Sequence, residues 1–161
     1  MSRPEPGTPE HWATQCPDAA AVICGNTVLT YRDWNDAADH VAEGLAALGL
    51  RPGDRIGMRF RLSVEWFVIQ RALQKLQVAQ VAVNWRLTPD EAVYILRDSS
   101  AKGLACNDVD ISGWIGHDVG VLVTVGQSAA ASGVRYEDLL TTPLTTPRYG
   151  PARPEIGRAH V

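Results

Sequence analysis

Two polar residues, Asn84 and Arg86, stand where this 161-residue sequence most readily places a ligand contact. Both follow a short uncharged run at 78–83 that predicts a β-strand. Open α/β sheets bind ligands just beyond the carboxyl ends of their strands, so a direct ligand contact is one interpretation. The other is that both side chains serve only local packing.

Three arginines alternate with apolar residues along a second predicted strand at 55–61. Arg55, Arg59 and Arg61 would share one face, which predicts a strand with one solvated or polar side. That face could bind an anion. We expect instead that it forms a solvated edge, or that its arginines pair with nearby Asp and Glu residues.

The remaining candidates favour structural roles. Trp34, Trp66 and Trp85 are predicted core anchors, with a lipid-facing role for Trp85 as one alternative. We expect His40 to be solvated or partly buried rather than a ligand, and Asp90-Glu91 to complement a helix dipole. The three cysteines form no Cys-x-x-Cys pair and the four histidines no ligand-like spacing, which argues against a metal site or a disulfide framework.

The composition excludes several classes of partner. The net charge is −3, and no basic stripe with interleaved aromatics occurs, which argues against nucleic acid. The N-terminus lacks the apolar core of a signal peptide, and no apolar run approaches the roughly 20 residues of a transmembrane segment. With 45% hydrophobic residues we expect one domain with a buried core. The three cysteines are odd in number and far apart, which fits a reducing compartment, so we expect a cytoplasmic location.

The elements that would position these residues alternate between strand and helix. Residues 78–99 predict a parallel strand buried on both faces, then a turn and a helix. Thr88 is the predicted N-cap, Pro89 takes the first helical position and Glu91 completes a capping box. The alternation predicts a doubly wound α/β sheet with right-handed crossovers. The other predicted elements are a helical turn capped by Thr8 or Thr14, a β-hairpin at 19–24 and 27–30, helices capped by Thr30 and Ser63, strands at 103–106 and 119–125, and a short helix at 135–140.

Several of these stretches, in this order, resemble the adenylate-forming acyl-CoA synthetases. Residues 29–34 resemble that family's Leu-Thr-Tyr-x-Glu-Leu element, and residues 48–56 resemble its Leu-Gly-Val-x-x-Gly-Asp-x-Val turn. Residues 84–88, Asn-Trp-Arg-Leu-Thr, look like the fatty-acyl-CoA ligase branch more than the peptide-synthetase adenylation domains. Residues 135–140 resemble a Tyr-x-Asp-Leu element that precedes the nucleotide site. The resemblance covers roughly Trp12 to Leu140.

One departure from the family pattern has a physical consequence. Gln77 stands where the family usually has glycine. If that glycine is a left-handed helix C-cap, glutamine in the same conformation would cost up to about 1 kcal/mol.

The resemblance implies an AMP-forming ligase for a fatty or other hydrophobic carboxylic acid, which makes acyl-AMP from ATP and then acyl-CoA. It also makes a role in an acyl pocket a further alternative for Trp85. ATP, Mg²⁺ and CoA are the implied cofactors of the complete enzyme. The family's Tyr-Thr-Ser-Gly-Thr-Thr-Gly-x-Pro-Lys-Gly motif is not in the sequence, and no lysine follows Lys102. We therefore expect an incomplete N-terminal portion of the large domain. It should have no catalytic, cofactor-binding or metal residue, bind none of these cofactors, and be inactive alone.

The expected organisation is a loose arm at 1–10, the AMP-binding portion at 11–140, an irregular segment at 141–155 and a tail at 156–161. The tail, Ile-Gly-Arg-Ala-His-Val, is what a common sequencing-library adapter encodes, so we expect it to be non-biological. Apolar faces left open by an incomplete layer predict self-association. Two alternatives stay open: a non-catalytic α/β interaction module, and part of a peptide-synthetase adenylation domain.

Overall fold

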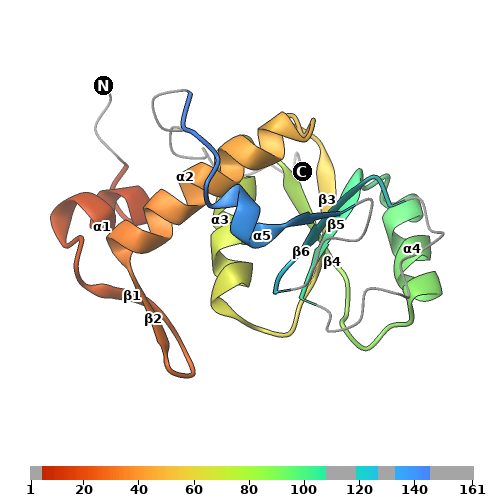
Figure 1. Ribbon diagram of the computed structural model, residues 1–161, viewed down its shortest axis with the longest axis horizontal. Helices are drawn as coiled ribbons and strands as arrows, with labels where there is room; N and C mark the ends of the chain where they lie inside the picture. Colours follow the sequence, from red (N-terminus) through yellow and green to blue (C-terminus); the bar gives the residue numbers. More distant parts are fainter. Residues whose placement is uncertain (1–4, 108–118, 127–132, 146–161) are drawn as a thin grey trace, which may run out of the picture.

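The computed structural model describes residues 5–107, 119–126 and 133–145. A five-stranded parallel sheet in the order β4-β3-β5-β6-β7 carries helices on both faces, and β1 and β2 form a separate hairpin (Figure 1). This confirms the predicted doubly wound α/β fold. The elements are α1 Pro9–Gln15, β1 Ala20–Cys24, β2 Thr27–Thr30, α2 Tyr31–Ala47, β3 Arg55–Arg59, α3 Val64–Leu76, β4 Ala79–Ala82, α4 Pro89–Asp98, β5 Gly103–Cys106, β6 Val121–Thr124, β7 Gly133–Arg135 and α5 Tyr136–Leu139.

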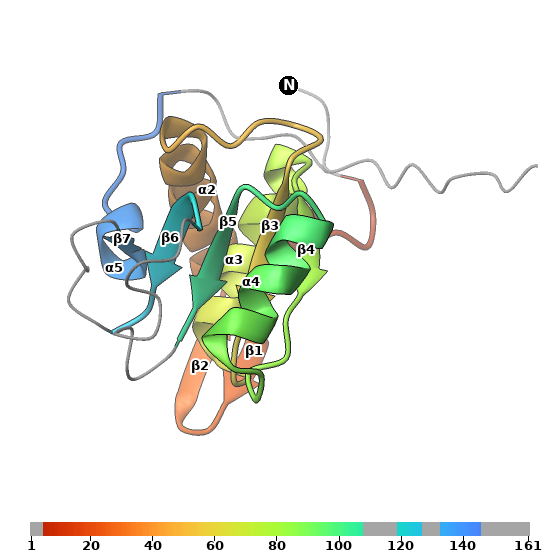
Figure 2. The same cartoon turned by 90° about the vertical axis from the view of Figure 1, so that its right-hand side faces the viewer.

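Two apolar clusters cover the two faces of the sheet. Helices α2, α3 and α5 pack on one face, and α4 packs on the other (Figure 2). Along β6, Val123 belongs to the first cluster and Leu122 to the second, as the alternation of a strand requires. A side-chain carbon added at Gly57 would lie 2.4 Å from Leu96 Cδ2, so a glycine lets α4 approach the central strand closely.

The prediction of a half-solvated strand at 55–61 is wrong. Only Arg55 of β3 is exposed, and Ile56 to Arg59 are all buried. The reason is the place of β3 inside the sheet, between β4 and β5, with helices on both sides. The arginine alternation therefore does not mark a solvent face.

The prediction that residues 78–83 form a strand buried on both faces is also wrong, although the strand is parallel as expected. β4 is an edge strand, in which Ala79, Gln80 and Ala82 are exposed. Only the flanking Val78 and Val83 are buried. Small uncharged residues look alike in a core strand and at an open edge, so the pattern could not separate the two.

The predicted hairpin and helix starts are confirmed, with one difference in detail. Thr30 with Asp33 and Thr88 with Glu91 each form a complete capping box. Hydrogen bonds from the Thr88 amide and hydroxyl lower the pKa of Glu91. Ser63 occupies the N-cap of α3 but makes no side-chain hydrogen bond to that helix. The short helix is α5, and the strand β7 directly before it was not predicted.

Gln77 does adopt the left-handed conformation. Its φ is 57° and its ψ is 35° at the end of α3. The amide of Val78 donates to Leu73 O at 2.9 Å and that of Gln77 to Gln74 O at 3.1 Å, which satisfies the last helical carbonyls. A residue with a Cβ holds a conformation that suits glycine.

We predict that Gln77→Gly raises the free energy of unfolding by about 0.5–1 kcal/mol, because it relieves this conformation. Urea unfolding followed by circular dichroism measures the change. Gln77→Ala is the matched control, since it removes the same side chain but keeps the Cβ. A glycine variant no more stable than the alanine variant would contradict the argument.

A buried cluster of charges joins the three N-terminal helices. The Lys75 side chain of α3 is fully buried, and its Nζ lies 2.5 Å from Asp39 of α2 and 3.1 Å from Glu10 of α1. Asn35 Oδ1 accepts another hydrogen bond from Lys75 at 2.8 Å. Arg71 pairs with both carboxylate oxygens of Glu10. Losing one member would leave a buried charge uncompensated, so the cluster fixes α1 and α3 against α2.

The charges of this cluster also make stability depend on acid pH. Burial opposes the ionisation of Glu10, but the Arg71 hydrogen bond and the charges of Lys75 and Arg71 hold its pKa below the ordinary 4.5. A carboxyl whose pKa is lowered by folding stabilises the protein above its unfolded pKa. This contribution is lost as the pH falls through the lowered value.

We predict that Glu10→Gln lowers the free energy of unfolding by about 3 kcal/mol at pH 7, because Arg71 and Lys75 lose their carboxylate. The difference from the unmodified chain should shrink as the pH falls below about 4.5. Urea unfolding at a series of pH values measures it, with Glu5→Gln at an exposed position as the control. A difference independent of pH would argue against an ionised Glu10.

Candidate functional site

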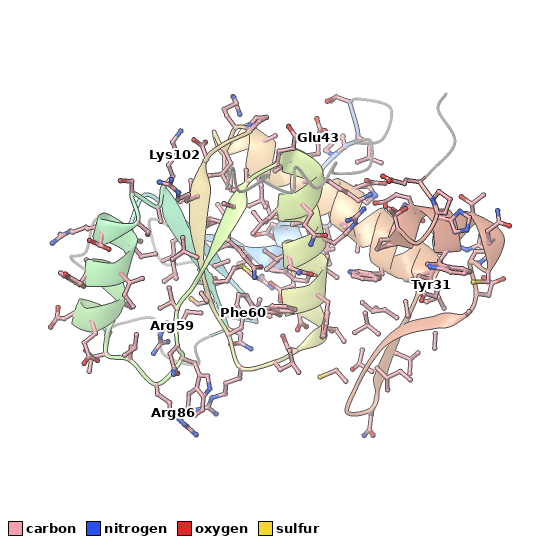
Figure 3. The ribbon with its side chains drawn as sticks, turned by 180° about the vertical axis from the view of Figure 1, so that it is seen from behind. Tyr31, Glu43, Arg59, Phe60, Arg86 and Lys102 are labelled. Carbon is pink, nitrogen blue, oxygen red and sulfur yellow. The ribbon has the colours of Figure 1, made fainter. Side chains whose placement is uncertain are left out.

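The carboxyl ends of the parallel strands bring the candidate residues to one end of the sheet, which we call its carboxyl edge to distinguish it from the edge strands β4 and β7. Figure 3 places Arg59, Phe60 and Arg86 at this end and Lys102 at the opposite end. Arg55 lies at the start of β3 and donates to Ser99 O at 3.0 Å, so it does not share a site with Arg59 and Arg61. Ligands of open α/β sheets bind at such carboxyl edges, so we take this edge as the candidate site.

Arg59 fixes the loop that follows β4. Its side chain leaves the last position of β3, and the residue is only 8% exposed. One guanidinium nitrogen donates to Trp85 O and to Leu87 O, both at 2.7 Å. The expectation that Arg59 lies on a solvated edge is therefore wrong. A buried cation hydrogen-bonded to two loop carbonyls sets the path of the backbone between β4 and α4.

Trp85 is not the predicted core anchor. It is 37% exposed, and the guanidinium carbons of Arg61 and Arg86 lie 4.4 and 4.9 Å from its ring centre. Trp34 and Trp66, by contrast, pack against the core as expected. Two guanidinium groups beside one exposed indole offer a planar apolar surface with donors for an anionic group.

Two asparagines shape the loops at this edge. Asn84 Oδ1 accepts from the Arg86 amide at 3.0 Å, a local turn that agrees with its packing interpretation. Asn107, after β5, bonds both backbone groups of Arg61, accepting at 3.0 Å and donating at 2.8 Å. Asn107 was not singled out by sequence reasoning, since nothing local links it to residue 61. A ligand contact for Asn84 or Arg86 stays a prediction.

The strand register continues the edge across the sheet. Arg59, Cys106, Thr124 and Arg135 are successive cross-strand partners at the ends of β3, β5, β6 and β7. Thr124 is fully buried, and its hydroxyl has no hydrogen-bond partner among the residues described. The row mixes cations, a thiol and a hydroxyl, so polar groups reach the carboxyl end of an otherwise apolar sheet.

Glu137 balances part of this positive charge. Its carboxylate accepts from the Gly126 amide at 2.9 Å and lies 3.5 Å from Arg135. Burial raises the pKa of neighbouring Tyr136, and the negative charges of Glu65 and Glu137 add to the effect. The phenol therefore keeps its proton to a higher pH than an ordinary tyrosine does.

The other candidates have the structural roles expected of them. His40 is partly buried, and its Nδ1 lies 2.7 Å from Thr142 O. Asp90 and Glu91 occupy the first turn of α4. The described residues hold no group of three or more His, Cys, Asp or Glu that could bind a metal, and none of their helices is long and apolar enough to cross a membrane.

Comparison with known proteins places this arrangement in one family. The family model described as AMP-binding enzyme matches residues 9–146. Over 92 residues the chain is 36% identical to the fatty acid–[acyl-carrier-protein] ligase ScoC of Streptomyces coeruleorubidus, which covers 57% of this chain and 18% of that protein. It is 34% identical over 87 residues to the rat mitochondrial medium-chain acyl-CoA ligase ACSF2, and this match covers 54% of this chain and 14% of that protein. Malpibaldin synthetase of Mortierella alpina is 29% identical over 99 residues, or 62% of this chain and 2% of that protein.

Solved structures agree on the fold. The apo structure of Mycobacterium smegmatis MbtA superposes with a TM-score of 0.76 at 26% identity, covering 89% of this chain and 28% of that one. The o-succinylbenzoate coenzyme A synthetase of Bacillus subtilis, in complex with AMP, superposes with a TM-score of 0.68 at 21% identity. That match covers 84% of this chain and 32% of the solved chain. The chain thus spans a fifth or less of the curated relatives' length and about a third or less of these solved chains.

The hydrogen bonds of Arg59 predict a specific loop effect. Arg59→Met should lower the free energy of unfolding by about 2–3 kcal/mol, because two carbonyls lose a charged donor. It should also speed tryptic cleavage after Arg86 under conditions where the fold persists. Mass spectrometry of the first cleavage products measures this, with Arg55→Met on the same strand as the control. Equal cleavage rates after Arg86 in both variants would contradict a role for Arg59 in holding the loop.

Proposed function

We propose that this chain, which belongs to the AMP-binding enzyme family, forms part of the large domain of an AMP-forming ligase for a fatty or other hydrophobic carboxylic acid. In the proposed reaction the carboxylate oxygen attacks the α-phosphorus of ATP, which gives acyl-AMP and releases pyrophosphate. The CoA thiol then attacks the acyl carbon, forms the thioester and releases AMP. A cytoplasmic location is part of this proposal.

One observation carries the proposal: the family match runs continuously over residues 9–146 and includes the loop at 84–88. Two curated relatives named above activate fatty or medium-chain acids, which supports a hydrophobic substrate. The carboxyl edge with Trp85, Arg61 and Arg86 would then face the substrates. Its exposed indole and guanidinium groups suit the phosphates and the planar base of a nucleotide.

We assign no adenylyl-transfer step to the described residues. They contain no cluster of carboxylates suited to Mg²⁺, although the edge arginines fit a phosphorylated ligand. The glycine-rich phosphate loop and its lysine are not in the 161-residue sequence. In this proposal the chain contributes scaffold and edge residues, and further polypeptide contributes the catalytic groups.

A peptide-synthetase adenylation domain is the second candidate, since malpibaldin synthetase is also a relative. The two candidates differ in the carboxylate that they activate. Fatty acids should drive pyrophosphate release by the first enzyme, and amino acids by the second.

The test begins with the encoding gene beyond codon 155, the last codon before the tail that we expect to be adapter-encoded. The complete reading frame is then expressed, and carboxylate-dependent pyrophosphate release is measured. We predict a Thr-Ser-Gly-Thr-Thr-Gly-x-Pro-Lys-Gly motif downstream and activity with medium- or long-chain fatty acids. The 161-residue chain assayed in parallel should release no pyrophosphate. A stop codon in place of that motif would favour the interaction module, and clear ATP turnover by the short chain would contradict the proposal.

A further inference from the structure

The two edges of the parallel sheet differ in how well they are protected against pairing with another strand. β7, at one edge, has three residues and ends in Arg135, which pairs with Glu137. β4, at the other edge, lies in a run without charge or proline that extends from Leu76 to Trp85. Proteins protect edge strands with charges, prolines, bulges or short length. Both edge strands are short, but β7 carries a charge and β4 carries none, so β4 is the less protected of the two.

The hydrogen-bonding groups of β4 divide between its two sides. Ala79 donates to Asp54 O at 2.8 Å and Val83 donates to Met58 O at 3.1 Å, so these amides point towards β3. Strand geometry then turns the amide and carbonyl groups of the intervening Gln80 and Ala82 away from β3. Both residues are exposed, and no strand among the residues described pairs with that side.

We propose that β4 is a self-association edge, at which it pairs antiparallel with β4 of a second copy of this chain. The two outward residues are spaced i and i+2, which suits a two-fold axis through Val81. Gln80 of each copy would then exchange two backbone hydrogen bonds with Ala82 of the other. The bonds number four in all, and the two five-stranded sheets become continuous.

The side chains are compatible with this pairing. Val81 is in register with Gly57, so it faces the side of the sheet that α4 covers, and it is only partly buried. At the two-fold axis it would meet Val81 of the second copy as a non-hydrogen-bonded pair, where side chains approach most closely. Ala79 and Ala82 are small, so they leave the backbones free to approach.

A second copy is a better occupant than an unrelated strand because the edge complements itself. A two-fold pair needs one strand to supply donors and acceptors in the order that its partner requires, and the outward groups of Gln80 and Ala82 do so. This inference does not rest on the proposed ligase activity. A failed activity assay and a failed association assay would therefore be separate results.

Sedimentation velocity of the full 161-residue chain over a concentration series tests the proposal. The expected result is a reversible monomer–dimer equilibrium. Hydrogen exchange should show amide protection at Gln80 and Ala82 that rises with protein concentration. Monomers at every concentration, or aggregates without a defined dimer, would overturn the proposal.

Two edge variants locate the interface. Gln80→Lys places like charges near the axis and should raise the dissociation constant at least about tenfold. Ala82→Pro removes one outward amide and leaves the β3 ladder intact, so it should act in the same direction. Gln70→Lys on α3 adds the same charge elsewhere and should change nothing.

Thermal melts confirm that each variant folds, and Gln80→Lys decides alone if Ala82→Pro does not fold. A dimer whose dissociation constant the folded edge variants leave unchanged would overturn the proposal. So would a dimer that is lost only in Ile23→Lys, a variant of the exposed hairpin face.

Discussion

The cation of Arg59 sets the constraint on which the candidate site depends. A guanidinium at the end of a central strand leaves water on folding, and it needs hydrogen-bond acceptors in return. Two of these are the carbonyls of Trp85 and Leu87, so the loop between β4 and α4 must curl back over the end of β3. Because its backbone is held there, the Trp85 ring stays at the surface, beside the guanidinium groups of Arg61 and Arg86.

A second set of buried charges joins the three N-terminal helices to one another. Lys75, Asp39 and Glu10 join α1, α2 and α3, whereas α4 is joined to the sheet by apolar packing around Gly57 and Leu96. The helices on one face are therefore fixed to one another by directional ion pairs in addition to the apolar cluster beneath them, whereas α4 is held on the other face by close apolar contact. At the carboxyl edge the connection after β3 leads to α3 in one layer, and the connection after β4 leads to α4 in the other.

Sequence reasoning succeeded where structure is local. The helix caps at Thr30 and Thr88 depend on residues three apart, and both formed as expected. It failed where position in the sheet decides, since the alternation of β3 and the uncharged run of β4 do not say which strand lies inside. The charge cluster joins residues 65 positions apart, from Glu10 to Lys75, so no local pattern could have indicated it.

The arginines of β3 show why the site could be predicted only in part. Their spacing put Arg55, Arg59 and Arg61 on one face, but β3 ends at Arg59, so Arg61 lies in the connection beyond the strand. Asn107, which follows the neighbouring strand β5, hydrogen-bonds to the backbone of Arg61, and the Arg61 guanidinium lies over the Trp85 ring. Residue types thus pointed to the carboxyl end of the sheet, whereas the grouping of Arg61, Trp85 and Arg86 could be seen only from the register of three strands.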